Sequence, residues 1–384
     1  MKKICFITTV SLTMKAFVLE SAKYLHNKGG YDVTLICNND EEFAKTLPDY
    51  INFIPVSMAR GLDFSAIASV IQLIKIFKKE KFDVIQYSTP NASLYASIAG
   101  FLTRIKIRRY SQCGIRYVSF NGLSRKIFKT FEKITCILST HIKAQSPKNM
   151  EFAIDEKLCK KDKISVIGIG GTIGVDLTQC RSFDHNQAKN DLRNKYKIPQ
   201  DAFVFGYVGR LNVDKGTNEL ITAFNKIAEG NPTLYLVLVG MLDDANPISD
   251  ENLKIATNHP RIIMTGNVDF GDVYPHMAMF DVLVHPTYRE GFGKVLQEAM
   301  GVGAPIITTD VPGPSEVIEN NISGILCEAK NSNDLADKMI MLYSNPELVE
   351  KLSAAGLERA EKYFDRPIML NNILEDFNKT TDRG

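Results

Sequence analysis

Short runs rich in β-branched and aliphatic residues recur along the chain, and helix-like segments separate them. The runs occupy residues 2–9, 31–37, 83–88 and 164–167 in the first half, and 202–209, 234–239, 262–265, 282–284 and 305–309 in the second. Strands that alternate with helices favour βαβ units and parallel sheets. At 384 residues the chain has room for two domains of ordinary size. The sequence therefore predicts an α/β protein with two domains, each with its own core.

The most specific phrase in the sequence is HPTYREGFGK, residues 285–294, which begins where the apolar run 282–284 ends. It predicts a strand, a tight loop and a helix over roughly 294–302. Gly291 and Gly293 leave the backbone free to take positive φ and to approach a ligand closely. The first N–H groups of the helix would be available to an anion. The phrase therefore predicts an anion-binding turn.

Two carboxylates bracket this turn, Glu290 before the glycines and Glu298 about one turn inside the helix. With its Gly-Phe-Gly insert and the Glu-Ala-Met that closes it, the phrase resembles the E-x7-E signature of the retaining family 4 glycosyltransferases. The resemblance implies the GT-B fold: two facing Rossmann-like domains, with a nucleotide sugar bound in the second. It implies that Glu298 grips the ribose hydroxyls and that Glu290 and the glycine amides lie against the sugar and the diphosphate.

A second phrase, Gly209-Arg210-Leu211 followed by Lys215-Gly216, resembles the diphosphate clamp of that family. A fixed Arg and Lys would stabilise the negative charge that develops on the leaving diphosphate. The resemblance thus implies catalytic roles for Arg210, Lys215 and Glu290. The donor-binding residues that it implies are Gly209, Arg210, Lys215, Asn267, Val268, Glu290, Gly291, Phe292, Gly293, Lys294, Val295 and Glu298.

The first domain carries weaker signals. The loop from Thr8 to Lys15, after the first strand, lies where open α/β sheets bind ligands. Many family members carry Gly-Gly there and a His-Gly at the place where this chain has Cys113-Gly114; a subset of capsule and O-antigen transferases shares the R-G-x-R-Y type of phrase and lacks the His. The expected acceptor-cleft residues are Ser11, Thr13, Ser88, Asn91, Arg116 and Tyr117.

The resemblance is strong over 203–328 and weaker over the first 180 residues. It implies an acceptor-binding domain at 1–180, a donor-binding domain at 181–362, and a C-terminal helix at 363–384 that crosses back to the first domain. The polar stretch after Asp176 is interpreted as a linker.

Charge divides the chain into a basic and an acidic half. Residues 1–170 hold 26 Lys and Arg against 14 Asp and Glu, and the remainder holds 20 against 30, although the whole chain has a net charge of only +2. A basic half attracts polyanions. Residues 124–134 combine Ile127, Phe128, Phe131 and Ile134 on one face with four cations around the rest, which fits either a helix on an anionic membrane surface or a core helix with a solvated back.

Metal and nicotinamide chemistry are both disfavoured. Asp243-Asp244 lacks the D-x-D spacing of metal-dependent transferases, so no metal or other cofactor is expected. The glycines from Gly168 to Gly174 do not fit G-x-G-x-x-G, because Ile173 stands where a glycine is required, and no amphipathic helix is expected after them. No apolar run is long enough to span a bilayer, and the seven cysteines lack metal-site spacing.

The sequence thus predicts a retaining glycosyltransferase that moves a sugar, an N-acetylhexosamine or a related hexose, from a UDP-sugar to a polyprenyl-diphosphate-linked saccharide. We expect a cytoplasmic protein, peripheral on the inner face of the cytoplasmic membrane, with no nucleic acid partner. UDP is expected from family frequency alone. One alternative stays open: a non-catalytic sugar-nucleotide-binding subunit, which the missing His favours and Arg210, Lys215, Glu290 and Glu298 oppose.

Overall fold

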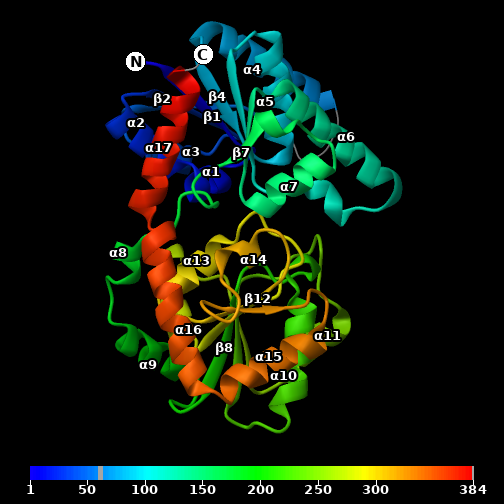
Figure 1. Ribbon diagram of the computed structural model, residues 1–384, viewed down its shortest axis with the longest axis vertical. Helices are drawn as coiled ribbons and strands as arrows, with labels where there is room; N and C mark the ends of the chain where they lie inside the picture. Colours follow the sequence, from blue (N-terminus) through cyan, green and yellow to red (C-terminus); the bar gives the residue numbers. More distant parts are fainter. Residues whose placement is uncertain (59–63, 383–384) are drawn as a thin grey trace. The chain divides into compact units, whose positions relative to one another are not determined.

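The computed structural model of the protein describes residues 1–58 and 64–382, and the side chains within those ranges apart from residues 64, 65, 116 and 119. The chain forms two compact units (Figure 1), residues 1–173 with 367–384 and residues 174–366. The first unit therefore ends at Ile173, where the sequence analysis placed the limit at 180, and the chain returns to it at Pro367, where the limit was placed at 362.

The first unit is built on a seven-stranded parallel sheet in the order β3-β2-β1-β4-β5-β6-β7. Its strands are β1 (Lys3–Ile7), β2 (Asp32–Cys37), β3 (Ile51–Pro55), β4 (Val84–Tyr87), β5 (Ile107–Gln112), β6 (His141–Ala144) and β7 (Ile164–Val166). Its helices are α1 (Ser11–Phe17), α2 (Leu19–Gly29), α3 (Glu41–Lys45), α4 (Phe64–Glu80), α5 (Pro90–Leu102), α6 (Gly122–Leu138) and α7 (Pro147–Asp155).

The second unit is built on a six-stranded parallel sheet in the order β10-β9-β8-β11-β12-β13. Its strands are β8 (Phe203–Val208), β9 (Leu234–Val239), β10 (Ile262–Gly266), β11 (Val282–His285), β12 (Ile306–Thr309) and β13 (Ile325–Cys327). Its helices are α8 (Leu177–Cys180), α9 (His185–Lys195), α10 (Thr217–Ala228), α11 (Asp250–Asn258), α12 (Val273–Met279), α13 (Lys294–Gly301), α14 (Pro314–Val317), α15 (Ser332–Tyr343) and α16 (Pro346–Arg359). The predicted α/β class with two parallel-sheet domains is confirmed.

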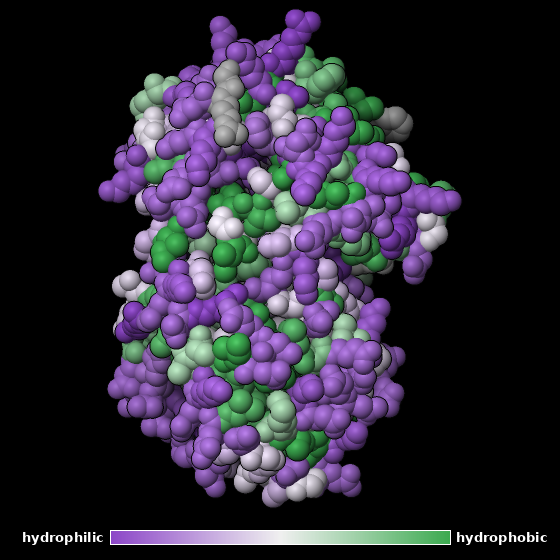
Figure 2. All heavy atoms as spheres, in the orientation of Figure 1, coloured by the Kyte–Doolittle hydropathy of each residue, from purple (hydrophilic) through white to green (hydrophobic). Residues whose placement is uncertain are grey.

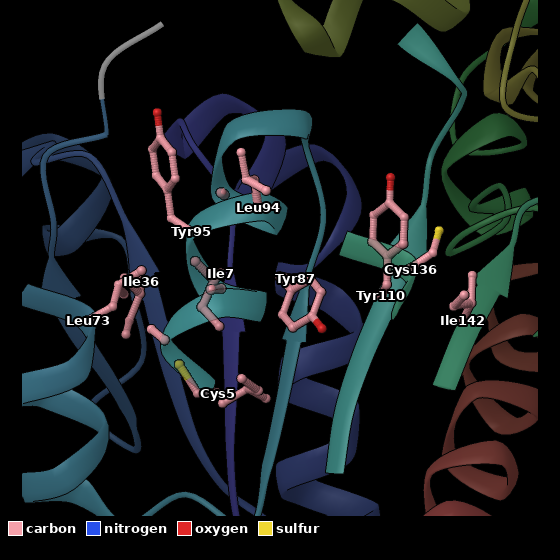
Figure 3. Packing of buried hydrophobic residues seen from close by; sticks show 14 of the residues in the cluster. Cys5, Ile7, Ile36, Leu73, Tyr87, Leu94, Tyr95, Tyr110, Cys136 and Ile142 are labelled. Atoms are coloured by element: carbon pink, nitrogen blue, oxygen red, sulfur yellow. The ribbon is translucent and has the colours of Figure 1, made fainter. Parts of the chain in front are cut away.

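Apolar side chains fill the space between sheet and helices within each unit. In the first unit the core between one face of the sheet and its helices includes Ile7, Tyr87 and Tyr110, from three neighbouring strands (Figure 3). The rings of Tyr87 and Tyr110 stack with centroids 6.1 Å apart. Hydrophilic residues cover most of the face drawn in Figure 2, and hydrophobic patches on it are small. The described helices include none long and apolar enough to cross a membrane.

The C-terminal helix α17 (Arg366–Asp382) returns to the first unit, as expected (Figure 1). A π-helical turn at Ala360–Phe364 ends α16, and Asp365 takes extended dihedrals before α17 begins, so the chain bends where the sequence predicts. Asp376 binds two cations of the sheet, Arg109 of β5 and Lys143 of β6. Phe377 packs on Phe6 with ring centroids 5.8 Å apart. These contacts hold α17 on the first sheet.

Two local predictions are wrong. The expected loop up to Lys15 is the helix α1 from Ser11 onward. The polar stretch after Asp176 was interpreted as a linker, but it forms α8 and α9. These helices form because Asp176 and Asp184 cap their first turns by accepting from backbone N–H groups at 3.0 Å.

Cationic residues anchor α9 to the second unit in place of an apolar face. Lys189 and Arg193 reach Asp281 at 2.8 and 2.9 Å, and the Arg193 guanidinium also donates to the carbonyl oxygens of Gln200 and Ala202. A helix held by ion pairs shows no hydrophobic periodicity, so that pattern could not predict α9.

Candidate active site

The candidate donor site lies at the carboxyl edge of the second sheet. Its strand order reverses between β8 and β11: from β8 the chain proceeds through β9 to β10 on one side, and β11, β12 and β13 follow on the other. Open α/β sheets bind ligands at such a switch point. The Gly209–Lys215 segment follows β8, and the 286–293 segment follows β11. The two sequence phrases therefore leave adjacent strands at the same end of the sheet.

Backbone contacts lock these two segments together. The amide of Tyr288 donates to the carbonyl oxygen of Asp214 at 2.8 Å, and Arg289 reaches the Asp214 carboxylate at 2.7 Å. Gly216 has φ 69°, and a Cβ there would lie 1.9 Å from the carbonyl oxygen of Pro286. Only glycine permits this approach. The short helical turn Val213–Lys215 is thereby fixed against the β11 loop.

Lys215 and Glu290 form an ion pair between the two segments. Their side chains are 20% and 27% exposed, so a ligand can reach both. Burial by itself would raise the pKa of the Glu290 carboxyl, but the positive charge of Lys215 outweighs it and holds that pKa well below its usual range. Glu290 is therefore a carboxylate at neutral pH, with Lys215 as its counter-ion.

His285 lies beneath this pair. Its side chain is 1% exposed, and its Nε2 lies 3.8 Å from Glu290 Oε2. Neither ring nitrogen has a hydrogen-bond partner within the described part of the chain. Burial lowers the pKa of His285, so the ring is neutral at pH 7. The His285 ring stacks on the ring of Tyr207, with the two centroids 5.8 Å apart.

A second pair lies at the start of α13, where Lys294 reaches Glu298 at 2.7 Å. Gly293 precedes the helix with φ 99°, whereas Gly291 does not take positive φ. The first backbone bonds of α13 are donated by Leu296 and Gln297 to the carbonyl oxygen of Gly293, so the amides of Lys294 and Val295 lie ahead of them at the helix start. Glu298 lies one turn inside the helix, as predicted.

The loop after β10 reaches the same site. Asn267 is exposed and Val268 half-buried in this loop, which continues into the short helical turn Phe270–Asp272. The Lys294 ammonium lies 5.3 Å from the centroid of the Phe270 ring. The structure therefore brings the loops after β8, β10 and β11 to one edge of the sheet. Phe292, by contrast, is buried and packs edge-on against Phe364, so its side chain anchors the loop.

A third pair joins Arg210 to Asp243, in the loop after β9. The Arg210 side chain is 68% exposed, whereas that of Asp243 is 12% exposed. Asn212 also donates to the Asp243 carboxylate, at 2.9 Å, and this bond is the main cause of the lowered pKa of Asp243. Asp243 therefore binds the exposed Arg210 side chain. In the sequence, Asp243 stands out only in the Asp243-Asp244 doublet, which lacks the D-x-D spacing of a metal site.

The acceptor residues of the first unit do not form a comparable set. Ser11 begins α1 and its hydroxyl donates to Asp40 at 2.5 Å, Thr13 is half-buried in α1, and Asn91 is half-buried in the first turn of α5. Ser88 is buried after β4. Tyr117 is buried as well, and its hydroxyl donates to Glu156 at 3.0 Å. The Arg116 side chain lies outside the described residues. The acceptor roles of these residues stay predictions.

Sequence reasoning missed three residues that shape the donor site: Asp214, Asp243 and His285. Asp214 holds Arg289, Asp243 holds Arg210, and His285 supports Glu290. Asp214 stands next to the Lys215 of the clamp phrase, and His285 opens the signature phrase. Their positions beside predicted site residues could have pointed to both. Asp243 had none, since its partner lies on another strand.

Comparison with known proteins places this geometry in a family. The family model described as "Glycosyl transferases group 1" matches residues 188–359, and "Glycosyl transferase 4-like" matches residues 3–146. The chain is similar to the capsular polysaccharide biosynthesis glycosyltransferase CapM of Staphylococcus aureus, with 30% identity over 98% of this chain and 97% of that protein. It is 27% identical to the UDP-Gal:alpha-D-GlcNAc-diphosphoundecaprenol alpha-1,3-galactosyltransferase of Escherichia coli, over 81% of this chain and 79% of that one.

Solved structures show the same fold. Anabaena HepE, solved in complex with UDP, superimposes with a TM-score of 0.79 at 19% identity and covers 99% of this chain and 100% of its own. Sucrose-phosphate synthase from Thermosynechococcus elongatus superimposes with a TM-score of 0.80 at 18% identity, over the full length of both chains. The fold and the site define a GT-B glycosyltransferase. The chain belongs to the group 1, family 4-like glycosyltransferases.

Proposed function

We propose that this glycosyltransferase moves a sugar from a UDP-sugar to a lipid-diphosphate-linked saccharide in bacterial surface polysaccharide synthesis, with retention of configuration. The sugar is an N-acetylhexosamine or a related hexose. Three cation–carboxylate pairs at the switch point carry the proposal: Lys215 with Glu290, Lys294 with Glu298, and Arg210 with Asp243. The UDP complex of HepE and the named acceptor of the Escherichia coli relative support the choice of donor and acceptor.

A diphosphate fits this set of pairs because each cation is already held beside an acidic group that a phosphate oxygen can replace. Arg210 supplies a bidentate fork and Lys215 a compact charge. The amides of Lys294 and Val295 at the start of α13 add N–H donors for phosphate oxygens. When the nucleotide binds, Glu298 exchanges its ion pair for the ribose hydroxyls, and Glu290 turns to the sugar.

In the proposed reaction the bond between the anomeric carbon and the phosphate oxygen breaks, and the electron pair stays on that oxygen. Arg210 and Lys215 stabilise the charge that develops there. The acceptor oxygen bonds to the anomeric carbon from the same face, and its proton passes to the leaving phosphate. No protein nucleophile is required, which agrees with the full charge pairing of Glu290.

We propose that the reaction requires no metal ion. Within the described part of the chain there is no cluster of three metal-ligating side chains. The Asp243 carboxylate already accepts from Arg210 and Asn212. Transfer should therefore continue in excess chelator. Loss of transfer in chelator, restored by Mg²⁺ or Mn²⁺, would contradict this part of the proposal.

The test is a screen of nucleotide sugars against the purified protein, with release of the nucleotide measured with and without a lipid-diphosphate-linked N-acetylhexosamine. Proton NMR of the product gives the anomeric configuration. We expect UDP release from one UDP-sugar and a product of unchanged anomeric configuration. Inversion would refute retention. Binding of a nucleotide sugar without hydrolysis or transfer would favour the non-catalytic subunit.

We further propose that the basic first unit docks on an anionic membrane surface. Three of the four apolar residues expected on the membrane-facing side of the helix, Phe128, Phe131 and Ile134 of α6, instead pack on the core of the first unit. Leu123, Ile127 and Ile137 remain exposed, at 72%, 41% and 59%. Of the lysines, Lys129 pairs with Glu156, whereas Lys126 and Lys133 are exposed.

Liposome sedimentation tests this docking. Binding should require anionic lipid and weaken with salt, because the attraction is electrostatic. Changing Lys126, Lys129 and Lys133 to Glu should abolish it, and the same change at Lys226, Lys254 and Lys351 of the acidic half serves as the control. Equal binding by both variants would refute the docking proposal without touching the transferase assignment.

A further inference from the structure

The first unit contains a small, partly open cavity of about 50 Å³ that the donor chemistry does not use. It lies at the carboxyl ends of three neighbouring strands, next to Ser88 after β4, Ser111 of β5, and Lys143 and Gln145 at the end of β6. Phe17 and Ile373 also line it. All of these residues belong to the first unit. The cavity therefore occupies the ligand-binding edge of the first sheet.

Gln145 is the polar residue of this cavity whose hydrogen bonding is least complete. Its side chain is 5% exposed, and its Oε1 is buried without a hydrogen-bond partner among the described residues. Among the described residues its Nε2 donates to Ser111 Oγ at 3.3 Å and to Cys113 Sγ at 3.8 Å. A buried acceptor without a donor is unfavourable, so this site is built to receive an N–H or O–H group.

Lys143 supplies a hydrogen-bond donor to the same cavity. Its side chain is 9% exposed, and the ammonium donates to Ser165 Oγ at 2.9 Å and to Asp376 Oδ1 at 2.5 Å. An ammonium has three N–H groups, so these two acceptors leave one for a ligand. The cavity thus offers a donor and an acceptor from adjacent strand-end positions.

The size and the walls narrow the choice of ligand group. A water-sized atom needs roughly 10–15 Å³ of such space, so the cavity holds about four heavy atoms. A sugar ring is too large. The aromatic ring of Phe17 and the side chain of Ile373 give it apolar walls beside the polar groups. A group with one N–H, one carbonyl and one methyl matches a site with one free acceptor, one free donor and an apolar wall.

We propose that this cavity binds the acetamido group of the acceptor sugar. The amide N–H donates to Gln145 Oε1, the carbonyl oxygen accepts from Lys143, and the methyl group packs on the apolar wall. A carboxylate or phosphate would leave Oε1 without a donor, and a lone hydroxyl would leave much of the cavity unfilled. The inference rests on the proposed function, since it specifies the acceptor of that reaction. Gln145 is thereby a specificity-determining residue.

The experiment compares two lipid-diphosphate-linked acceptors that differ only in an acetamido or a hydroxyl group at one carbon of the sugar. For the wild type we expect kcat/KM to favour the acetamido acceptor by about 10- to 100-fold, because a site that hydrogen-bonds a substrate group rejects an analogue lacking it. Gln145→Met should bring this ratio close to one through a raised KM for the acetamido acceptor. Gln145→Glu, which keeps an acceptor atom, should preserve most of the preference.

Gln72→Leu is the control, because Gln72 is an exposed glutamine on α4 of the same unit. Donor hydrolysis without acceptor is measured in every variant, and it should stay at the wild-type rate in Gln72→Leu. Absence of hydrolysis and of transfer in the wild type would overturn the proposed function itself. Intact donor hydrolysis with equal use of both acceptors by the wild type, or an unchanged preference in a folded Gln145→Met protein, would overturn the acetamido site alone.

Discussion

The two units hold their paired cations in different ways. At the ligand edge of the second sheet the cations have separate carboxylates, as in the pairs of Lys215 with Glu290 and Lys294 with Glu298. In the first unit two cations, Arg109 and Lys143, share Asp376. Arg109 is wholly buried and also donates to Gln86 and Thr380.

Because of this difference, the cations of the second set can exchange a carboxylate for a ligand, whereas those of the Asp376 cluster cannot. Lys215 and Glu290 are 20% and 27% exposed and Arg210 is 68% exposed, so an incoming phosphate can replace a carboxylate beside these two cations at modest cost. The first-unit cluster lies under α17, and removal of its carboxylate would leave two buried positive charges uncompensated. We infer that the Asp376 cluster fixes the C-terminal helix, with one N–H of Lys143 left for the proposed acceptor group, and that the second set serves donor chemistry.

The largest expected effect is on stability, from Asp376→Asn. The change leaves Arg109 and Lys143 without their shared carboxylate, so we expect the first unit to lose about 3–5 kcal/mol of unfolding free energy. Thermal denaturation measures the loss. Asp382→Asn is the control, since Asp382 is 76% exposed and its partner within residues 1–58 and 64–382 is Lys2, at 3.5 Å. Similar melting of the two variants would show that α17 does not depend on the cluster.

The next effect is on turnover. Arg210→Ala should lower kcat by roughly a hundredfold or more, as for other preorganised groups that stabilise developing charge. Its melting temperature should stay near that of the wild type, because the Arg210 side chain is 68% exposed. Arg181→Ala removes another exposed arginine of the same unit that pairs with a carboxylate, Glu361, and should keep full activity. Near-wild-type turnover in Arg210→Ala would show that Arg210 does not stabilise the leaving diphosphate.

A smaller effect divides the two glutamates. Glu298→Gln should weaken the binding of UDP alone about tenfold, because a carboxylate that accepts from ribose hydroxyls contributes more than an amide. Glu290→Gln should change UDP affinity less than twofold and should lower turnover with the complete donor. Calorimetric titration with UDP measures the first quantity and nucleotide release the second. Equal losses of UDP affinity in the two variants would show that the glutamates do not have separate roles.

The smallest effect concerns pH. Burial lowers the pKa of His285, so below about pH 6.5 the unfolded chain binds a proton at this ring that the folded protein does not. Stability is therefore lost as the pH falls. His285→Asn should reduce the loss between pH 7.5 and 5.5 by about 1 kcal/mol, measured by urea denaturation. An identical pH dependence in variant and wild type would show that the ring is protonated in the folded state.

The fold class and the local geometry of most of the candidate donor site could be predicted from the sequence. Apolar runs that alternate with helical segments predict parallel sheets, because parallel strands need long crossover connections. In the 285–294 phrase, the signals for a strand, a turn and a helix follow one another within a few residues. Local spacing therefore placed Glu298 one turn inside α13 and Gly293 before it, and the structure agrees. The three missed donor-site residues and the α9 helix show where such reasoning stops.

Pairings between distant residues required the tertiary structure. Hydrophobic periodicity could not find α9, because Arg193 and Lys189 hold that helix by charge on Asp281. It could not foresee Arg109 buried within β5, because the carboxylate that makes the burial tolerable lies 267 residues away in α17. Nor could it link Arg210 to Asp243, which follows a different strand. The sequence by itself determined the strands of both sheets and the strand, turn and helix of the 285–294 phrase, since these depend on neighbours along the chain. Only the tertiary structure decided which charge faces which, because electrostatic partners are set by distance in space.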